Sequence, residues 1–149
     1  MSGGGTNVHA SCVLIGASGV LLRGGSGAGK SRLGDLLVLQ ARAEGRFAAH
    51  VADDRVELAV AHGRVVATAP HMLSGLWERR GEGICRVEVE PRALLRLVVD
   101  LENASEIERM PDEEAMGETL LGVRLPRLVL AGAEPHLAAL RILTGLGKA

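Results

Sequence analysis

The chain alternates between short apolar runs and short polar or glycine-rich breaks, a pattern that favours many strands and few helices. Near the N-terminus, the turn Gly16-Ala17-Ser18-Gly19 separates an apolar run over 8–15 from a second run over 20–22 and predicts a hairpin. The leucine spacing predicts an amphipathic helix over 31–43, and residues 135–146 predict a closing helix.

The other apolar runs predict strands over 47–52, 55–60, 64–68, 84–89, 94–101, 120–123 and 127–130. Residues 71–77 predict one or two helical turns, 78–83 a charged loop, and 103–117 a long acidic loop. The chain shows no internal repeat and no linker. We therefore expect one mixed α/β domain over 8–149, preceded by a flexible tail over 1–7.

The segment after the second apolar run reads Gly24-Gly25-Ser26-Gly27-Ala28-Gly29-Lys30-Ser31, which is the Walker A pattern. Glycines let backbone N–H groups face a phosphate chain, Lys30 adds a charge near the outer phosphates, and the Ser31 hydroxyl can ligate Mg²⁺. The following helix points its positive N-terminus at the same anion. A strand, the loop and a helix come in the required order, so we expect nucleotide phosphates to bind here.

An acidic pair, Asp53-Asp54, ends the buried apolar run that follows the predicted helix. P-loop proteins hold Mg²⁺ at such a strand end, directly or through water. A carboxylate beside the γ-phosphate could also take the proton from an attacking hydroxyl group. A solvated turn is the alternative for the pair taken alone, and the Walker A pattern upstream favours the functional interpretation.

Other polar side chains carry weaker signals. His9 lies on the first strand of the predicted hairpin that leads to the Walker A loop and could bind phosphate or bias a neighbouring carboxylate, but a structural histidine fits as well. Glu78, with Arg79 and Arg80, could supply a Mg²⁺ ligand and phosphate-binding guanidinium groups, or simply a solvated loop. The remaining histidines are scattered and are interpreted as surface or structural residues: His50, His62, His71 and His136.

Composition excludes several classes of function. The chain has 149 residues, 47% of them hydrophobic, and a net charge of −1, which is typical of a globular domain. Lys and Arg number 17 against 18 Asp and Glu, and aromatic residues make up only 1%, so we expect no nucleic-acid partner. The sequence has no signal-peptide pattern and no long apolar run, so we expect a cytoplasmic protein with no membrane partner.

Segments of the chain, taken in order, resemble the C-terminal catalytic domain of HPr kinase/phosphorylase in its short, single-domain form. They are Val8-His9-Ala10, the Walker A loop, Val51-Ala52-Asp53-Asp54-Arg55-Val56, and Glu78-Arg79-Arg80-Gly81-Glu82-Gly83-Ile84, and residues 98–103 and 122–126 also fit. The A-D-D-R-V and E-x-R-G-x-G-I boxes discriminate more strongly than Walker A does. The resemblance implies a P-loop kinase domain with a mixed sheet, similar to the nucleotide-binding domain of phosphoenolpyruvate carboxykinase.

The same resemblance implies an ATP- and Mg²⁺-dependent protein-serine kinase that phosphorylates HPr, the phosphocarrier of the sugar phosphotransferase system. By position it implies nucleotide binding by the Walker A loop and Mg²⁺ binding by Ser31 and Glu78. Asp53 joins these metal candidates as part of the acidic pair. The implied catalytic residues are His9, Lys30, Asp54 as the base, and Arg109.

Some points stay open at the level of sequence. Residues 129–136 lack the arginine-asparagine of the family's P-V-x-x-G-R-N segment, which leaves open whether phosphoserine-HPr is also a substrate for phosphorolysis. A homo-oligomer is compatible with the resemblance. The alternatives are an ATP-binding regulatory module without phosphotransfer and a small-molecule kinase of the P-loop type.

Overall fold

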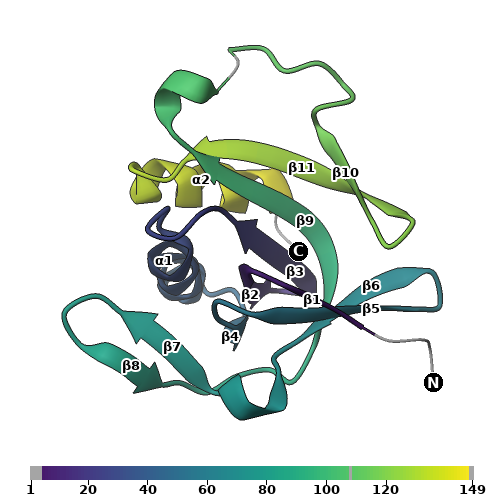
Figure 1. Cartoon of the computed structure of the whole chain (residues 1–149). Helices are drawn as coiled ribbons and strands as arrows, with labels where there is room; N and C mark the ends of the chain where they lie inside the picture. The colour runs from purple at the N-terminus through teal and green to yellow at the C-terminus, as the bar shows by residue number, and fades with distance from the viewer. Residues whose placement is uncertain (1–4, 108, 148–149) are drawn as a thin grey trace.

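A curled mixed sheet forms the centre of the computed structural model, which describes residues 5–107 and 109–147 (Figure 1). Its strands are β1 (Thr6–Val8), β2 (Ala10–Ile15), β3 (Ser18–Arg23), β4 (Ala48–Ala52), β5 (Val56–Ala61), β6 (Arg64–Thr68), β9 (Ala93–Glu102), β10 (Gly117–Leu120) and β11 (Val123–Ala131). Helices α1 (Lys30–Ala43) and α2 (Pro135–Leu146) cover one face, and β7 (Leu76–Arg79) and β8 (Gly83–Arg86) form a separate hairpin. Short 3₁₀ turns span His71–Leu73 and Ala104–Glu106.

The strand directions decide where the ends of the strands meet. The main path runs β1-β5-β6-β9-β3-β2-β4, with β11 also paired to β9. Strand β2 is antiparallel to both β3 and β4, so β3 and β4 run in the same direction. The carboxyl ends of β3 and β4 and the amino end of β2 therefore lie at one edge of the sheet. These three ends carry the Walker A loop, the acidic pair and His9, respectively.

Hydrophobic residues fill both faces of the central strands. Leu22 and Val99 pack toward α1 and α2, whereas their neighbours Leu21 and Val98 pack into a second cluster enclosed by the curl of the sheet. A strand buried on both faces has no polar side to alternate with, which explains the continuous apolar runs in the sequence. Neither helix in the described part of the chain is long and apolar enough to cross a membrane.

Most predicted elements are present, including both helices and the hairpins β2–β3 and β5–β6. The run over 8–15, predicted as one strand, is split at His9, because β1 pairs with β5 while β2 pairs with β3 and β4. Thr6 and Asn7, which the sequence assigned to the tail, pair with Leu58 and Glu57. The first four residues of that tail lie outside the described residues.

The prediction was wrong for residues 76–79, which form strand β7 rather than a helical turn followed by a loop. The reason is tertiary: the fully buried Trp77 packs over Gly34 of α1, and this burial outweighs the local charged and glycine-rich pattern. The partner strand is also shorter than predicted, since β8 ends at Arg86.

The prediction was also wrong around residues 120–123, where a strand was expected. Leu121 and Gly122 form the turn of the β10–β11 hairpin, with φ values of 49° and 81°. Pro126 lies inside β11 instead of dividing two strands. Proline is tolerated there because the pairing of β11 with β9 begins only at Arg127.

Candidate active site

The Walker A residues connect β3 to α1 as a tight glycine-rich loop. Gly27 and Gly29 have φ values of 80° and 102°, a region that favours glycine. Helix α1 begins without a side-chain cap, which leaves its first N–H groups available to an anion. The buried Lys30 donates hydrogen bonds from Nζ to the carbonyls of Gly24, at 2.9 Å, and Gly25, at 3.3 Å. The loop is thus shaped for phosphate, and Lys30 already lies over it.

Asp53 is the buried member of the acidic pair, and it joins three elements of the site. Its Oδ1 accepts hydrogen bonds from Oγ of Ser11, at 2.6 Å, and from Oγ of Ser31, at 2.7 Å. Its Oδ2 accepts a hydrogen bond from the backbone N–H of Glu78, at 2.8 Å. These bonds use three of the roughly four lone-pair positions of a carboxylate. Asp53 therefore holds β2, α1 and β7 together, and contact with a metal ion through water fits it better than direct ligation.

Asp54 turns outward from the same corner. Its φ of 67° lies in the left-handed region, which an Asp tolerates better than most residues. The reversal keeps Asp53 buried and leaves Asp54 exposed. Nε2 of His9 donates a hydrogen bond to Oδ1 of Asp54 at 2.7 Å, and the N–H of Ala10 donates to the Asp54 carbonyl at 3.2 Å. The start of β2 thus fixes both the backbone and the carboxylate of Asp54.

These side chains line one open cleft of about 1080 Å³ beside α1 and the β7–β8 hairpin. The predicted residues that the structure brings together in it are His9, Ser26, Gly27, Gly29, Lys30, Ser31, Asp53, Asp54 and Glu78. The outer part of the cleft is aliphatic, with Leu39 56% exposed and Ile84 65% exposed. The cleft therefore joins a phosphate loop, a group of carboxylates and an apolar rim.

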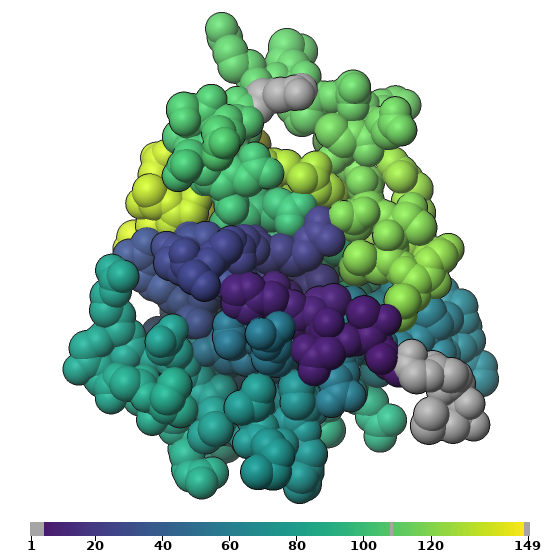
Figure 2. Space-filling model, viewed as in Figure 1, coloured from purple at the N-terminus to yellow at the C-terminus, as the bar shows by residue number. Residues whose placement is uncertain are grey.

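Arg109 is not among the residues that line this cleft. It lies on the exposed segment between β9 and β10, which projects from the body of the molecule in the space-filling view (Figure 2). The base of this segment is held by charge pairs, since Arg23 donates to Asp100 at 2.7 and 2.8 Å and Arg127 donates to Asp100 at 2.6 Å. A catalytic role for Arg109 requires the segment between β9 and β10 to approach the cleft. That role stays a prediction.

Sequence reasoning missed a cluster that joins α1, β4 and β7, here called the Asp35 cluster (Asp35, His50 and Arg79); Asp35 and Arg79 also line the cleft. Arg79 donates two hydrogen bonds to the Asp35 carboxylate, both at 3.0 Å, and His50 Nε2 lies 2.9 Å from Oδ1 of Asp35. The His50 ring meets Trp77 edge-on, with the ring centroids 4.5 Å apart. The one available signal was the occurrence of an ionisable residue, His50, in an otherwise apolar run.

The electrostatics of the Asp35 cluster follow from burial and pairing. Burial raises the pKa of Asp35, but the hydrogen bonds from Arg79 and His50 outweigh it and hold that pKa below its ordinary value. Burial lowers the pKa of His50, and the hydrogen bond with Asp35 offsets this only in part. The hydrogen bond to Asp35 raises the pKa of Arg79. The cluster is thus an ion pair joined by an imidazole that favours its neutral form.

The segment after β11 packs directly on the Walker A loop. A Cβ atom on Gly132 would overlap the carbonyl oxygen of Ala28, and Arg32 donates to the Gly132 carbonyl at 3.4 Å. Pro135 and His136 line the cleft, so His136, interpreted from sequence as a surface or structural residue, lies at the site. The segment that lacks the expected arginine-asparagine is therefore adjacent to the phosphate loop.

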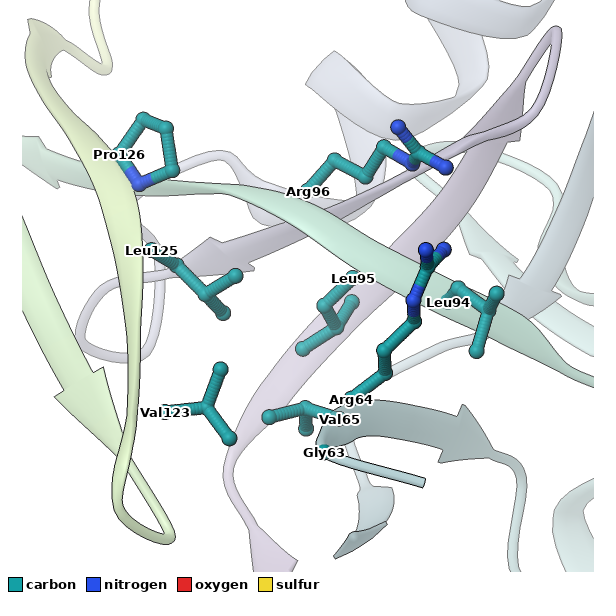
Figure 3. Close-up of a pocket in the computed structure, with 9 residues that line it drawn as sticks. All are labelled: Gly63, Arg64, Val65, Leu94, Leu95, Arg96, Val123, Leu125 and Pro126. Atoms are coloured by element: carbon teal, nitrogen blue, oxygen red, sulfur yellow. The ribbon is translucent and has the colours of Figure 1, made fainter. Parts of the chain in front are cut away.

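A second hollow, of about 360 Å³, lies where β6, β9 and β11 meet (Figure 3). Val65, Leu95 and Leu125 form part of its wall, and the side chains of Arg64 and Arg96 extend beside it. Its lining includes no carboxylate, hydroxyl, thiol or imidazole group. This hollow therefore offers no acid, base or nucleophile, and the cleft at the Walker A loop is the candidate active site.

The fold and the cleft together define a class of protein. A phosphate loop follows one strand and faces an acidic pair at the end of a strand that runs in the same direction, which is the arrangement of P-loop nucleotide-binding domains. The family model described as HPr Serine kinase C-terminal domain matches residues 4–134. The chain belongs to the HPr serine kinase C-terminal domain family.

Curated relatives and a solved structure agree with this assignment. The HPr kinase/phosphorylase proteins of Bordetella pertussis and Bordetella bronchiseptica are each 33% identical to this chain over 136 residues. The match covers 84% of this chain but 42% of each relative, so the chain spans less than half the length of these relatives. The Hpr(Ser) kinase/phosphatase from Coxiella burnetii has the same fold, with a TM-score of 0.78, 23% identity, and coverage of 95% of this chain and 96% of that one.

Proposed function

We propose that this chain is the catalytic domain of an ATP-dependent protein-serine kinase that phosphorylates HPr. The observation that carries the proposal is that the Walker A loop and the Asp53-Asp54 pair meet in one cleft, with Asp54 exposed and paired with His9. Membership of the HPr serine kinase family and the HPr kinase/phosphorylase relatives support HPr as the protein substrate.

The residues of the cleft fit ATP together with Mg²⁺. The Ser31 hydroxyl and the Glu78 carboxylate offer oxygen donors, which Mg²⁺ prefers, and we assign these two residues to hold it while Asp53 contacts it through water. Among the described residues, no three His, Cys, Asp or Glu side chains are grouped to hold a metal ion alone. This fits Mg²⁺, which in kinases takes phosphate and water oxygens as well. When bound, Mg²⁺ neutralises charge on the phosphate oxygens.

Asp54 is the proposed base. His9 occupies its Oδ1, so we assign Oδ2 to the hydroxyl of the substrate serine. The serine oxygen forms a bond to the γ-phosphorus, the bond from that phosphorus to the bridging oxygen breaks, and the serine proton passes to Asp54. Lys30 and the N–H groups of the Walker A loop stabilise the charge on the phosphates, and ADP leaves. In the reverse direction, with inorganic phosphate as the acceptor, the protonated Asp54 would return its proton to the serine oxygen.

The rim of the cleft favours a protein substrate over a small metabolite. Leu39, Leu73 and Ile84 line the cleft and are exposed, although burial of such side chains is favourable. A docked protein surface would bury them together, whereas a small metabolite at the carboxylates would leave them in water. The aliphatic rim thus supports a folded phosphocarrier as the substrate.

The proposal is tested with ATP labelled at the γ-phosphate, Mg²⁺ and purified HPr. We expect label on a serine of HPr, and no label when Mg²⁺ is omitted or when Lys30→Ala replaces the wild type. Binding of ATP without any labelled HPr would reject the kinase and leave an ATP-binding regulatory module. Transfer of label to a small molecule with HPr absent would indicate a metabolite kinase. A second arm, with phosphoserine-HPr and inorganic phosphate, tests the reverse reaction.

A further inference from the structure

Strand β7 carries Glu78, yet it belongs to a hairpin that lies outside the central sheet (Figure 1). In the described part of the chain, β7 pairs with β8 alone. A ladder of backbone hydrogen bonds therefore does not fix Glu78 relative to the Walker A loop. Asp53 links the backbone N–H of Glu78 to the Ser31 hydroxyl, and contacts made by the neighbours of Glu78 fix the rest of the strand.

Both neighbours of Glu78 contact α1. Side chains alternate along a strand, so Trp77 and Arg79 share the face that meets the helix and Glu78 lies on the opposite face, and all three residues line the cleft. Nε1 of Trp77 donates a hydrogen bond to the Ser31 carbonyl at 2.9 Å. Arg79 donates from Nε and Nη2 to the two oxygens of Asp35. Because Ser31 and Asp35 lie one helical turn apart, the two contacts fix both the position and the direction of β7 along α1.

His50 ties the Asp35 cluster to the sheet. It lies on β4, which ends at the acidic pair, and its imidazole contacts both Asp35 and Trp77. Its carbonyl also accepts a hydrogen bond from the N–H of Glu90, at 2.9 Å, just beyond the returning strand of the hairpin. The hairpin is thus held at β7 through Asp35 and at its return through His50.

We propose that Asp35 is a positioning residue that, through Arg79 and His50, holds strand β7 so that the Glu78 carboxylate faces the Walker A loop. This inference rests on the proposed role of Glu78 as a Mg²⁺ ligand. Asp35 also lines the cleft, but Arg79 and His50 occupy its carboxylate oxygens, so we assign it no contact with nucleotide or metal. Its effect reaches Mg²⁺ through the placement of Glu78, whereas the Walker A loop holds the phosphates without it.

The test compares Asp35→Asn, Arg79→Gln and the double variant with the wild type. Calorimetry measures ATP affinity without Mg²⁺ and then Mg²⁺ affinity at saturating ATP. We expect Asp35→Asn to weaken Mg²⁺ affinity about 10-fold to 100-fold, as loss of a supporting contact to a metal ligand does, while ATP affinity without Mg²⁺ is unchanged. Because the two side chains act as one unit, the double variant should be little worse than either single variant.

Trp77 provides an independent readout because it is the only tryptophan in the sequence. Its emission spectrum should shift in Asp35→Asn and in Arg79→Gln, since both variants remove a contact that holds β7 against α1. The matched control is Glu44→Gln, which removes one negative charge at the other end of α1 and should change neither Trp77 emission nor Mg²⁺ affinity. Arg79→Gln, which alters a partly exposed side chain, keeps the test informative if Asp35→Asn does not fold.

Unchanged Mg²⁺ affinity and Trp77 emission in Arg79→Gln would overturn the inference. Equal losses of ATP affinity with and without Mg²⁺ would also overturn it, because they would indicate general damage to the domain. These binding measurements do not need phosphate transfer. A wild type that binds Mg²⁺ and ATP but leaves HPr unlabelled would therefore reject the proposed function and leave the role of Asp35 to be decided by binding alone.

Discussion

Nε2 of His9 lies 2.7 Å from Oδ1 of Asp54, although 45 residues separate the two in the chain. His9 occupies the break between β1 and β2, and Asp54 occupies the turn after β4. Because β2 and β4 are antiparallel neighbours, the start of one strand lies beside the end of the other. The sheet therefore places an imidazole against the proposed base, where it can orient the carboxylate and stabilise its charge.

The first prediction concerns Asp54→Asn. An amide of the same shape cannot accept the serine proton, so kcat for HPr phosphorylation should fall about 10²- to 10⁴-fold. ATP affinity should stay within about twofold, because we assign the phosphates to the Walker A loop and not to Asp54. Labelled-phosphate kinetics and calorimetry measure the two quantities. Full turnover of Asp54→Asn with HPr would reject Asp54 as the base.

A companion variant, His9→Gln, distinguishes the contribution of His9 to kcat from that of Asp54. Glutamine can still donate a hydrogen bond to Asp54 but cannot carry a positive charge. We expect a smaller loss of kcat than for Asp54→Asn. When both substitutions are combined, the loss should match that of Asp54→Asn alone, since His9 acts through the carboxylate. Additive losses would indicate that His9 contacts the substrate independently.

The convergence of much of the candidate site in one cleft could be predicted, because local sequence signals mark the loop and the strand end. The Walker A loop combines glycines, Lys30 and Ser31 between an apolar run and an amphipathic pattern, and each part has its own local cause. The acidic pair stands where a buried run ends, which predicts a strand end and hence the edge of the sheet. Both helices follow from leucine spacing and the position of Pro135.

The rest depended on contacts between distant segments. Nothing local marks residues 76–79 as a strand, because burial of Trp77 against Gly34 decides it. Ser11 looked like one polar residue in an apolar run, and its partner Asp53 is 42 residues away. The direction of Asp54 depends on a positive φ, which no residue pattern for Asp specifies. In each case the missing information was the pairing of segments in the sheet and the packing of side chains across it.

The second prediction concerns Ser11→Ala. The Ser11 hydroxyl is fully buried, donates to Asp53 and accepts a hydrogen bond from the Asp54 N–H at 3.3 Å. Its removal leaves a buried carboxylate with one donor fewer, and such bonds to charged groups contribute about 1.5–3 kcal/mol. Urea denaturation should show a loss of stability of that size. Ser105→Ala, on an exposed 3₁₀ turn, is the control and should change stability by less than about 0.5 kcal/mol.

A loss in Ser11→Ala no larger than in Ser105→Ala would contradict this account of Asp53. We also expect Ser11→Ala to lower kcat, because both aspartates lose the group that joins them. ATP affinity without Mg²⁺ should change little, since Ser11 does not line the cleft.

The third prediction concerns the stability of the folded chain as the pH is lowered. Burial lowers the pKa of His50 below its ordinary 6.5, so the unfolded chain takes up this proton at a higher pH than the folded chain. Stability should therefore begin to fall as the pH drops through about 6.5 and continue to fall down to the lower folded pKa. Denaturant titrations at a series of pH values measure the effect. His50→Gln should remove this step, and an unchanged step in that variant would contradict the assignment.

A second loss of stability is expected at lower pH. Burial raises the pKa of Asp35, but hydrogen bonds from Arg79 and His50 bring it below the ordinary value of 3.8. Burial likewise raises the pKa of Asp100, and hydrogen bonds from Arg23 and Arg127 bring it below the same value. The folded chain thus holds these carboxylates ionised where the unfolded chain protonates them. Their contribution is complete above about pH 3.8 and is lost as the pH falls further.

The last prediction compares two glycine-to-alanine variants. A Cβ at Gly132 would overlap the Ala28 carbonyl, which is fixed backbone, so Gly132→Ala must displace the Walker A loop or the end of β11. We expect a stability loss of about 1–3 kcal/mol and weaker ATP binding. Gly145 lies in α2 with nothing within 4 Å of such a Cβ, so Gly145→Ala should stabilise the domain by about 0.5–1 kcal/mol and leave ATP binding unchanged. Equal effects of the two variants on ATP affinity would show that the segment after β11 does not support the phosphate loop.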